Sequence, residues 1–186
     1  MLILASESPR RRELLKRIVP EFTVVSPQVE ELEEGRDLEK LPEENALLKA
    51  EAVARCFPEA LVLGADTAVF SEGRMLGKPA SAAEAAVMLG SLSNRSHKVI
   101  SGVALVCREK ALRCSWSVVS SVRFKELSPQ EIAAYMERVN VLDKAGAYAI
   151  QEYPELLGAS WEGEVENIIG LPLLKLQEVL ESAGAL

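Results

Sequence analysis

Short apolar runs recur along the chain and alternate with stretches whose apolar residues have helical spacing. The runs at 1–5 (MLILA) and 60–65 (ALVLGA) are apolar throughout, which is typical of buried strands, and 22–25 adds a shorter strand. Two longer runs, 97–107 and 112–124, predict a hairpin. Strands that alternate with helices and include a long hairpin predict an α/β (α+β) fold with a mixed sheet.

Helices are predicted where apolar spacing coincides with a capping signal. Ser81 and Ser128 each stand three residues before a glutamate, in the pattern of a capping box. The predicted helices, in chain order, are 8–18, 42–55, 81–92, 128–139 and 170–184. Residues 143–163 are predicted to form a glycine-containing strand and loop.

The first helix begins in an unusual way. Ser8 suits the N-cap and Pro9 the first helical turn, yet three arginines follow at once. Cations at this positive end of the helix dipole are disfavoured by roughly 0.3–1 kcal/mol each. Three arginines at this end therefore need either solvent or an anion around them.

Helical periodicity separates these arginines. Arg10 shares a helical face with Leu14, and Arg11 shares one with Leu15, whereas Arg12 points to solvent. An inward arginine pair beside the N–H groups of a helix N-terminus predicts a phosphate-binding site. The alternative is an arginine-rich solvated turn.

A candidate acidic group follows the third apolar run. The predicted strand 60–65 delivers Asp66 at its carboxyl end, where ligands collect in open α/β sheets, and Gly64 and Ala65 are small enough to let a ligand approach. An aspartate there suits a magnesium ligand or a base that acts on water. The alternative is an aspartate that caps a turn.

Three further polar residues carry weaker signals. Lys49 (LLKAEA) and Lys78 (LGKP) supply point charges that suit phosphate oxygens, although each alone is more often a surface lysine. Gln151 ends a predicted strand of small residues (AGAYAIQ), where a glutamine suits the orientation of a water or contact with a base edge.

Composition narrows the function classes. The net charge of −7 over 186 residues argues against non-specific binding of nucleic acid, and no apolar run reaches the ~18 residues of a membrane span. The three cysteines are too sparse for a disulfide framework and are expected to be reduced, with a Cys107–Cys114 pair across the hairpin as the alternative. The N-terminus lacks the order of a signal peptide. We therefore expect a cytoplasmic protein that binds neither nucleic acid nor membranes. The acidic segment 28–44 is expected to be solvated and mobile.

Several known reaction motifs are excluded. His97 is the only histidine, so a Cys/His zinc cluster is ruled out, and a surface position or a hydrogen-bonded structural role is favoured for it over catalysis. The stretch 73–78 (GRMLGK) is not a P-loop, because three residues separate its glycines and Pro79 follows its lysine. The sequence also contains no D-x-D or G-x-G-x-x-G motif.

Eight segments in register resemble the Maf family of nucleoside triphosphate pyrophosphatases. They are LASESPRRRELL, VEE (29–31), LLKAEAVA, LVLGADTAVF, LGKP, LSNRSHKVISGVAL, LDKAGAYAIQ and NIIGLPL, and they span Leu2 to about Leu174. The resemblance implies hydrolysis of a nucleoside triphosphate to the monophosphate and pyrophosphate with Mg²⁺ or Mn²⁺. It further implies one Maf-like domain over 1–186, a fold related to inosine triphosphate pyrophosphatase with two lobes around a cleft, and a homodimer.

The same resemblance implies the residues that bind the substrate. The phosphates would be held by Ser6, Arg10 and Arg11, with help from Lys49 and Lys78, and Lys78 would also assist catalysis. The segment DKAGAYAIQ resembles the subfamily that acts on dTTP and UTP.

Catalytic roles are implied for three further positions. Glu31 and Asp66 would be the acidic residues that handle metal and water, with Asp66 as the general base, and Gln151 would lie near the reacting phosphate. Two alternatives to a pyrophosphatase stay open: a nucleotide-binding regulator of cell division or septum formation with little turnover, and a phosphatase or kinase-like phosphotransferase.

The chain departs from the family pattern at three glycines, where it has Asn94, Ala149 and Glu152. Alanine for glycine is a mild change. Glu152, in contrast, is expected to bring a negative charge near the site, which bears on the choice of base more than on phosphate chemistry.

Overall fold

A computed structural model describes residues 1–35 and 37–185. Arg36, which falls in the predicted acidic segment, and Leu186 lie outside the described residues. The strands are β1 (Leu2–Ala5), β2 (Thr23–Val24), β3 (Leu61–Ser71), β4 (Arg74–Leu76), β5 (Ser96–Cys107), β6 (Leu112–Arg123) and β7 (Ser160–Glu162). The helices are α1 (Pro9–Lys16), η1 (Leu38–Lys40), α2 (Leu41–Cys56), α3 (Ala82–Leu92), α4 (Pro129–Met136), η2 (Ala145–Ala147), α5 (Pro154–Leu157), α6 (Val165–Ile169) and α7 (Leu173–Ser182), where η marks a 3₁₀ helix.

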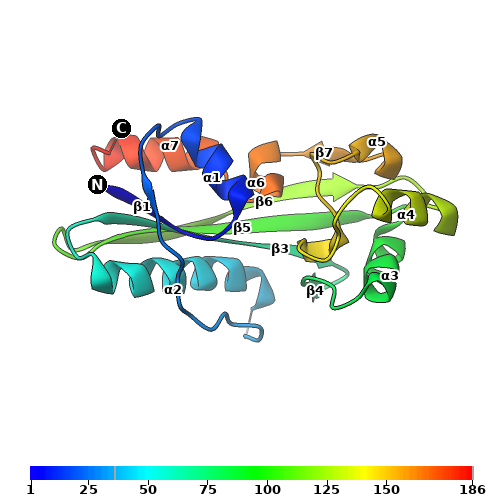
Figure 1. Cartoon of the computed structure of the whole chain (residues 1–186), viewed down its shortest axis with the longest axis horizontal. Coiled ribbons are helices and arrows are strands. Elements are labelled where there is room, and N and C mark those ends of the chain that lie inside the picture. The colour runs from blue at the N-terminus through cyan, green and yellow to red at the C-terminus, as the bar shows by residue number, and fades with distance from the viewer. Residues whose placement is uncertain (36, 186) are drawn as a thin grey trace. The chain divides into compact units, whose positions relative to one another are not determined.

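The described strands form a seven-stranded sheet in the order β2-β1-β3-β5-β6-β7, with β4 paired to β3. β1 runs parallel to β2 and β3, whereas the β3–β4 and β6–β7 pairs are antiparallel. The prediction of a mixed α/β fold with a long hairpin (β5–β6) is confirmed (Figure 1).

The chain divides into two compact units. Unit 1 comprises 1–67, 101–118 and 170–186, and unit 2 comprises 68–100 and 119–169. The strands β3, β5 and β6 each continue from one unit into the other.

In unit 1, helix α2 packs closely against the sheet, with α1 and α7 on the opposite face (Figure 1). Two glycines allow this approach: a Cβ on Gly64 would lie 2.1 Å from the carbonyl oxygen of Ala46, and one on Gly102 would lie 2.2 Å from the backbone of Pro42. The buried cluster beneath α2 is built mainly of small residues, among them Ala46, Ala50, Ala54 and Ala104. Gly64 thus makes room for a helix, and the expectation that it makes room for a ligand is wrong.

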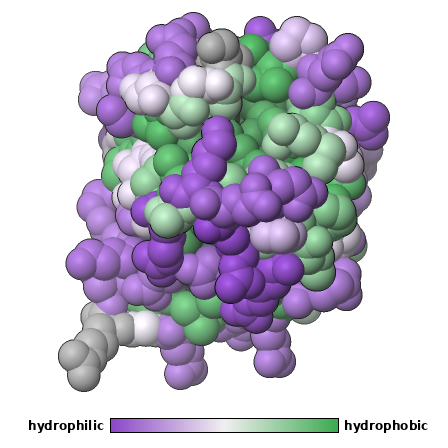
Figure 2. All heavy atoms as spheres, turned by 90° about the vertical axis from the view of Figure 1, so that its left-hand side faces the viewer, coloured by the Kyte–Doolittle hydropathy of each residue, from purple (hydrophilic) through white to green (hydrophobic). Residues whose placement is uncertain are grey.

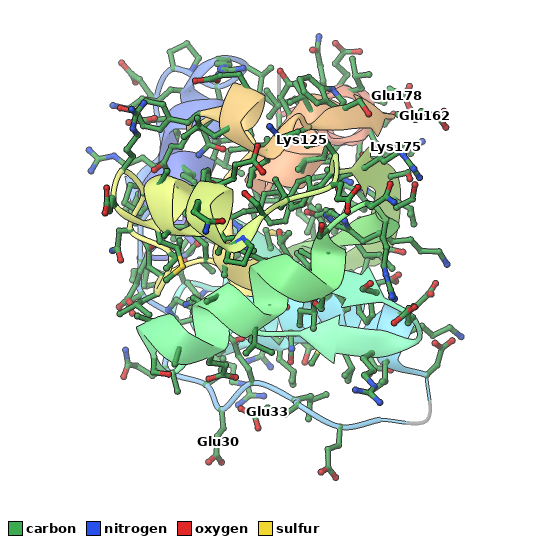
Figure 3. The ribbon with its side chains drawn as sticks, turned by 90° about the vertical axis from the view of Figure 1, so that its right-hand side faces the viewer. Glu30, Glu33, Lys125, Glu162, Lys175 and Glu178 are labelled. Atoms are coloured by element: carbon green, nitrogen blue, oxygen red, sulfur yellow. The ribbon has the colours of Figure 1, made fainter. Side chains whose placement is uncertain are left out.

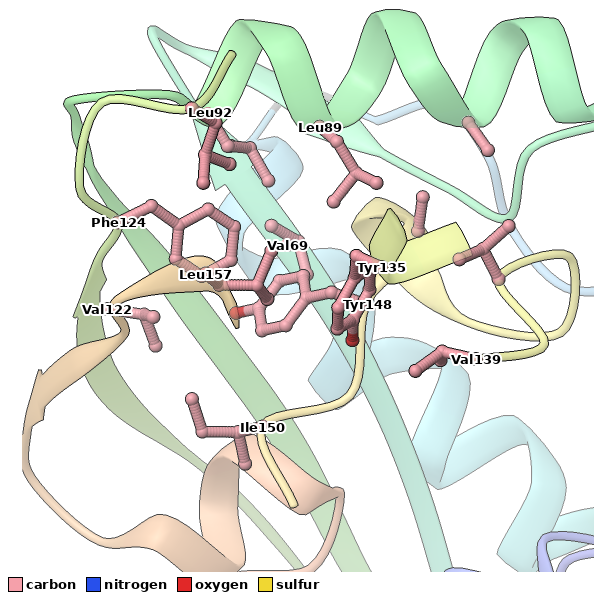
Figure 4. Close-up of a cluster of buried hydrophobic side chains, with 14 of the residues drawn as sticks. Val69, Leu89, Leu92, Val122, Phe124, Tyr135, Val139, Tyr148, Ile150 and Leu157 are labelled. Carbon is pink, nitrogen blue, oxygen red and sulfur yellow. The ribbon is translucent and has the colours of Figure 1, made fainter. Parts of the chain in front are cut away.

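Unit 2 has an aromatic core (Figure 4). Phe124 and Tyr148 meet edge to face at 4.9 Å, and both rings make the same kind of contact with His97. His97 is 3% exposed, and its Nε2 lies 2.8 Å from the hydroxyl of Tyr148. Of the two roles predicted for His97, the hydrogen-bonded structural role is confirmed and the surface position is wrong.

Two predicted strands differ from the structure. β3 does not end before Asp66 but runs on to Ser71, because beyond Gly64 it leaves its parallel partner β1 and pairs with β4 instead. Residues 148–151 are not a strand, since Gly146 (φ 68°) and Ala147 (φ 63°) turn the backbone into the left-handed region just before them.

The predicted helix starts agree with the structure at the three serine caps. The hydroxyls of Ser8, Ser81 and Ser128 each accept a hydrogen bond from the backbone N–H three residues on, and Ser128 with Glu131 forms a complete capping box. Helix α1 ends at Lys16, two residues before its predicted end. The short helix α6 was not predicted.

The end of unit 1 that carries the chain termini bears a hollow of about 370 Å³. It is lined by both apolar and charged residues, including Leu2, Leu61, Glu59 and Lys110, and Figure 2 shows hydrophilic and hydrophobic residues intermixed on this face. None of the predicted site residues lines it. Among the described residues, no helix is long and apolar enough to cross a membrane.

Candidate functional site

The structure divides the predicted site residues between the units. Six of them belong to unit 1, and their segments meet near the carboxyl end of β1: Ser6, Arg10, Arg11, Glu31, Lys49 and Asp66. Lys78 and Gln151 belong to unit 2, where both are exposed.

The Arg11 side chain turns inward from the first turn of α1. Its Nε donates to the carbonyl oxygen of Gly170 at 2.9 Å, its Nη1 to the Ser6 hydroxyl at 3.3 Å and its Nη2 to the Thr67 hydroxyl at 3.2 Å. Thr67 is fixed in turn by the hydroxyl of Ser101 at 2.8 Å. Because a guanidinium has five N–H donors, these three bonds set its plane and leave donors for a ligand.

Arg11 lies in an environment that is unusual for a cation. Burial lowers the pKa of the Arg11 guanidinium, nearby Asp66 and Glu31 oppose that shift, and Arg10 adds to it. The guanidinium stays charged, because its ordinary pKa lies so far above neutral. The prediction that Arg11 points inward is confirmed, and Arg12 is exposed as expected.

Lys49 is the centre of a charge cluster, which we call the Lys49 triad and which comprises the buried Lys49, the largely buried Asp66 and the half-exposed Glu31. The Lys49 Nζ lies 2.7 Å from Glu31 Oε1 and 2.8 Å from Asp66 Oδ1. The Lys49 side chain is 7% exposed and that of Asp66 is 14% exposed. Lys49 is therefore not a surface lysine, and it brings together the two carboxylates that the sequence singled out.

One residue that sequence reasoning missed positions Glu31. Asn45 lies one helical turn before Lys49 on α2, and its side-chain amide binds both backbone groups of Leu32, at 2.7 Å to the N–H and 3.1 Å to the carbonyl. These two hydrogen bonds fix the backbone next to Glu31. All three glutamates are exposed, but Glu30 and Glu33 project away from the protein (Figure 3), whereas the Glu31 carboxylate turns to Lys49.

Asp66 owes its position to the strand pairing. Ala5, the last residue of β1, pairs with Gly64, so Asp66 lies two residues beyond the end of β1 although β3 continues. Ser6 follows β1 directly, and its hydroxyl also accepts from the Ser8 N–H at 3.2 Å. The expected meeting of charges at a strand end therefore occurs, but at the end of β1.

The carboxylates of Glu31 and Asp66 fit a divalent cation that brings ligands of its own. Each directs one oxygen to the same point, where the Lys49 Nζ lies. Among residues 1–35 and 37–185, no group of three or more His, Cys, Asp or Glu side chains is placed to hold a metal. Mg²⁺ bound with a nucleotide commonly takes only one or two carboxylates and completes its shell with water and phosphate oxygens, so two carboxylates suffice.

In unit 2, the DKAGAYAIQ segment buries a second lysine. The Lys144 Nζ lies 2.6 Å from the Asn140 carbonyl oxygen, 2.9 Å from Asp143 Oδ1 and 3.4 Å from Glu152 Oε1. Glu152 thus has a cationic neighbour within its own unit, and its expected effect on the choice of base stays a prediction. Asn94 takes a left-handed conformation (φ 53°), which explains why glycine suits that position and why asparagine is tolerated.

The unit 1 residues together can bind and polarise a polyanion. Arg11 offers oriented donors and Lys49 a buried ammonium, while Asp66 and Glu31 supply carboxylates for a metal or a water. Such an arrangement suits phosphate-transfer chemistry, in which positioning and charge neutralisation contribute more than a protein nucleophile does.

Known proteins resemble this chain over nearly its whole length. The family model of Maf-like proteins matches residues 1–183. The "dTTP/UTP pyrophosphatase" of Akkermansia muciniphila is 44% identical over 98% of this chain and 96% of its own, and that of Symbiobacterium thermophilum is 47% identical over 98% and 94%. Among solved structures, the Staphylococcus aureus Ham1 protein matches with a TM-score of 0.57 and 21% identity, over 98% of both chains, which supports the fold alone.

Proposed function

Because the chain belongs to the Maf family, we propose that it is a nucleoside triphosphate pyrophosphatase that hydrolyses dTTP and UTP to the monophosphate and pyrophosphate. Two relatives with this activity in their names are 44% and 47% identical to it over almost the full length. The observation that carries the proposal is the Lys49 triad, which lies within electrostatic reach of the oriented guanidinium of Arg11.

In this proposal the cations of unit 1 bind the triphosphate. Arg11 donates its remaining N–H groups to phosphate oxygens, and Arg10, Ser6 and Lys49 add donors around it. The N-terminus of α1 adds the favourable dipole of a helix end. The charge that makes three arginines unfavourable at this position in an isolated helix becomes favourable once a polyanion lies there.

The proposed chemical step is attack of water on the α-phosphorus. Asp66 accepts a proton from the water, a P–O bond forms at the α-phosphorus, and the bond from the α-phosphorus to the bridging oxygen breaks, so that pyrophosphate leaves. Arg11 and Lys49 neutralise the negative charge that the leaving pyrophosphate gains.

We further propose that Glu31 and Asp66 hold a divalent metal, Mg²⁺ or Mn²⁺, together with the phosphates. When bound, such an ion neutralises phosphate charge and lowers the pKa of a bound water. Lys78 and Gln151 keep the roles that the family resemblance implies for them. A cytoplasmic location and a homodimeric state are also proposed; light scattering after size-exclusion chromatography tests the latter.

The proposal is tested by the identity of the phosphate product. The purified protein is incubated with Mg²⁺ and dTTP, UTP, CTP or GTP, and the products are separated by ion-exchange chromatography. We expect pyrophosphate and monophosphate, fastest from dTTP and UTP. Orthophosphate and diphosphate would contradict the proposal, and binding without turnover would favour the nucleotide-binding regulator.

Arg11→Ala and Arg12→Ala form a matched pair for the phosphate-binding step. Both remove one arginine from the same helical turn, but only Arg11 is held by Ser6, Thr67 and Gly170. We expect Arg11→Ala to raise KM at least about tenfold, as expected for loss of a charge-assisted bond of about 1.5–3 kcal/mol. Arg12→Ala is expected to leave both KM and kcat unchanged, and equal effects of the two changes would contradict the role of Arg11.

A further inference from the structure

The buried ammonium of Lys49 occupies the point to which Glu31 and Asp66 each direct a carboxylate oxygen. We propose that Lys49 excludes free divalent cations from the carboxylate pair, so that the metal enters only together with the triphosphate. This inference rests on the proposed function, because it concerns how the same site is loaded. The substrate of the enzyme would accordingly be the metal–nucleotide complex rather than the free nucleotide.

The geometry supports a direct competition for the same carboxylate oxygens. One oxygen of Glu31 and one of Asp66 lie at 2.7 Å and 2.8 Å from the same nitrogen, which is the arrangement of two ligands around a shared cation. An ion bound by these oxygens must displace the ammonium or draw the carboxylates away from it. The burial of both the Lys49 and the Asp66 side chains strengthens the attraction between these two groups that must be overcome.

The balance of charges in the cluster also disfavours binding of a free divalent cation. Lys49 and Arg11 carry two positive charges that face the two negative charges of Glu31 and Asp66, and Arg10 adds a further positive charge next to Arg11. The cluster therefore has no excess negative charge with which to attract a free divalent ion. A triphosphate reverses this balance, because it brings several negative charges into the site.

The triphosphate also gives the ammonium another partner. A lysine ammonium has three N–H donors, and Glu31 and Asp66 account for two contacts. A phosphate oxygen beside Lys49 would take the third donor and then compete for the others. As the ammonium shifts toward phosphate, the carboxylate oxygens become available to the cation that the phosphates carry.

The experiment measures Mn²⁺ binding by electron paramagnetic resonance, without turnover. Mn²⁺ is titrated into the wild-type protein alone and then with α,β-methylene-dTTP, in which the scissile oxygen is replaced. We expect no saturable binding by the protein alone in the millimolar range and, with the analogue, saturable binding beyond that of the same analogue without protein. Lys49→Met is expected to bind free Mn²⁺ at least about tenfold more tightly than wild type, because one repelling charge is lost. The added change Asp66→Asn is expected to abolish that gain.

A matched control removes an exposed lysine from an ion pair in the same unit. The Lys175 Nζ lies 2.8 Å from Glu178 Oε2 on the surface of α7 (Figure 3), and both side chains are more than half exposed. Lys175→Met is expected to leave Mn²⁺ binding unchanged. If Lys49→Met does not fold, Lys49→Arg keeps the charge and is expected to exclude free Mn²⁺ as wild type does.

Tight binding of free Mn²⁺ by the wild-type protein would overturn the inference, whatever the variants do. So would a gain in Lys49→Met that survives the Asp66→Asn change. These results are independent of the product assay: pyrophosphate release together with tight binding of free Mn²⁺ refutes only the inference. The absence of pyrophosphate release refutes the proposed function instead.

Discussion

Unit 1 and unit 2 surround their buried polar groups with different kinds of residues. In unit 1, Lys49 draws its two carboxylate partners from separate segments of the chain, and the surrounding cluster consists largely of alanine and other small residues. In unit 2, His97 and Tyr148 bind each other within an aromatic cluster. The unit 1 groups converge on a point that a ligand can take over, whereas in unit 2 the His97 Nε2 and the Tyr148 hydroxyl pair with each other. Unit 1 therefore carries the charge cluster on which the proposed chemistry depends, whereas the aromatic core of unit 2 contributes packing energy.

The largest effect is expected on activity, from Asp66→Asn. Loss of a general base lowers kcat by about 10²–10⁴-fold. The side chain keeps its shape, so the fold is retained, but the Lys49 ammonium loses one of its two carboxylate partners and the melting temperature should fall. Steady-state kinetics and thermal unfolding of the same preparation measure both. If activity stays near that of wild type, Asp66 is not the base.

In unit 2, Phe124→Ala is expected to act on stability instead. Phe124 is 1% exposed and packs against both His97 and Tyr148, and loss of a buried phenylalanine costs about 3–5 kcal/mol. Urea unfolding measures the loss. Val87→Ala, at a residue 72% exposed on α3, serves as the control and should change stability by less than about 0.5 kcal/mol. If the two variants are equally stable, unit 2 does not depend on its aromatic core.

The His97 cluster also predicts a pH dependence of stability. Burial lowers the pKa of His97 from 6.5 to about 4, and its Nδ1 has no hydrogen-bond partner among the described residues. Between pH about 6.5 and 4 the unfolded state binds the proton and the folded state does not. Stability therefore falls as pH falls through this window, by up to about 3 kcal/mol.

His97→Phe should remove this part of the dependence, which urea unfolding at a series of pH values detects. Glu131 interferes little, because its hydrogen bonds with Lys125 and Ser128 lower the pKa of its carboxyl from 4.5 to about 2. Its own contribution to stability is therefore lost between pH about 4.5 and 2, which overlaps only the lower end of the His97 window. An unchanged pH profile in His97→Phe would show that the histidine does not control acid stability.

The smallest effect on activity is expected from Asn45, which positions Glu31 but is not itself proposed to contact the substrate. Asn45→Ala removes the clamp on Leu32 that precedes the ion pair of Glu31 and Lys49. Its loss, about 1–2 kcal/mol, corresponds to a fall of about tenfold in kcat/KM. Asn45→Asp, which keeps the acceptor for the Leu32 N–H, should recover part of the lost kcat/KM. A loss of stability with unchanged kcat/KM would indicate a purely structural role.

Local signals predicted much of the fold. Hydroxyl caps at Ser8, Ser81 and Ser128 depend only on neighbouring residues, and all three helices begin where they were predicted. The end of β3 was missed because the hydrophobic pattern stops at Asp66 and Thr67, while the strand is continued by its pairing with β4. The strand predicted at 148–151 is absent because Ala147 just before it takes a left-handed conformation, and a sequence pattern does not predict that conformation for an alanine.

The site shows the same limit. Arg11 was predicted to point inward because helical periodicity fixes its direction. Glu31 could be separated from Glu30 and Glu33 only through a family resemblance, because the choice among them depends on the bond between Asn45 and Leu32, whose partners are far apart in sequence. The burial of Lys49 likewise follows from Gly64 and Gly102, which let α2 approach the sheet.

The central claim is that the charges of unit 1 direct a water at the α-phosphorus of a nucleoside triphosphate. The most direct test is hydrolysis of dTTP by the wild-type protein in water enriched in ¹⁸O, with the products observed by ³¹P nuclear magnetic resonance. The account predicts pyrophosphate without label and dTMP with one ¹⁸O on its phosphorus. Label in pyrophosphate, or release of labelled orthophosphate with dTDP, would contradict it.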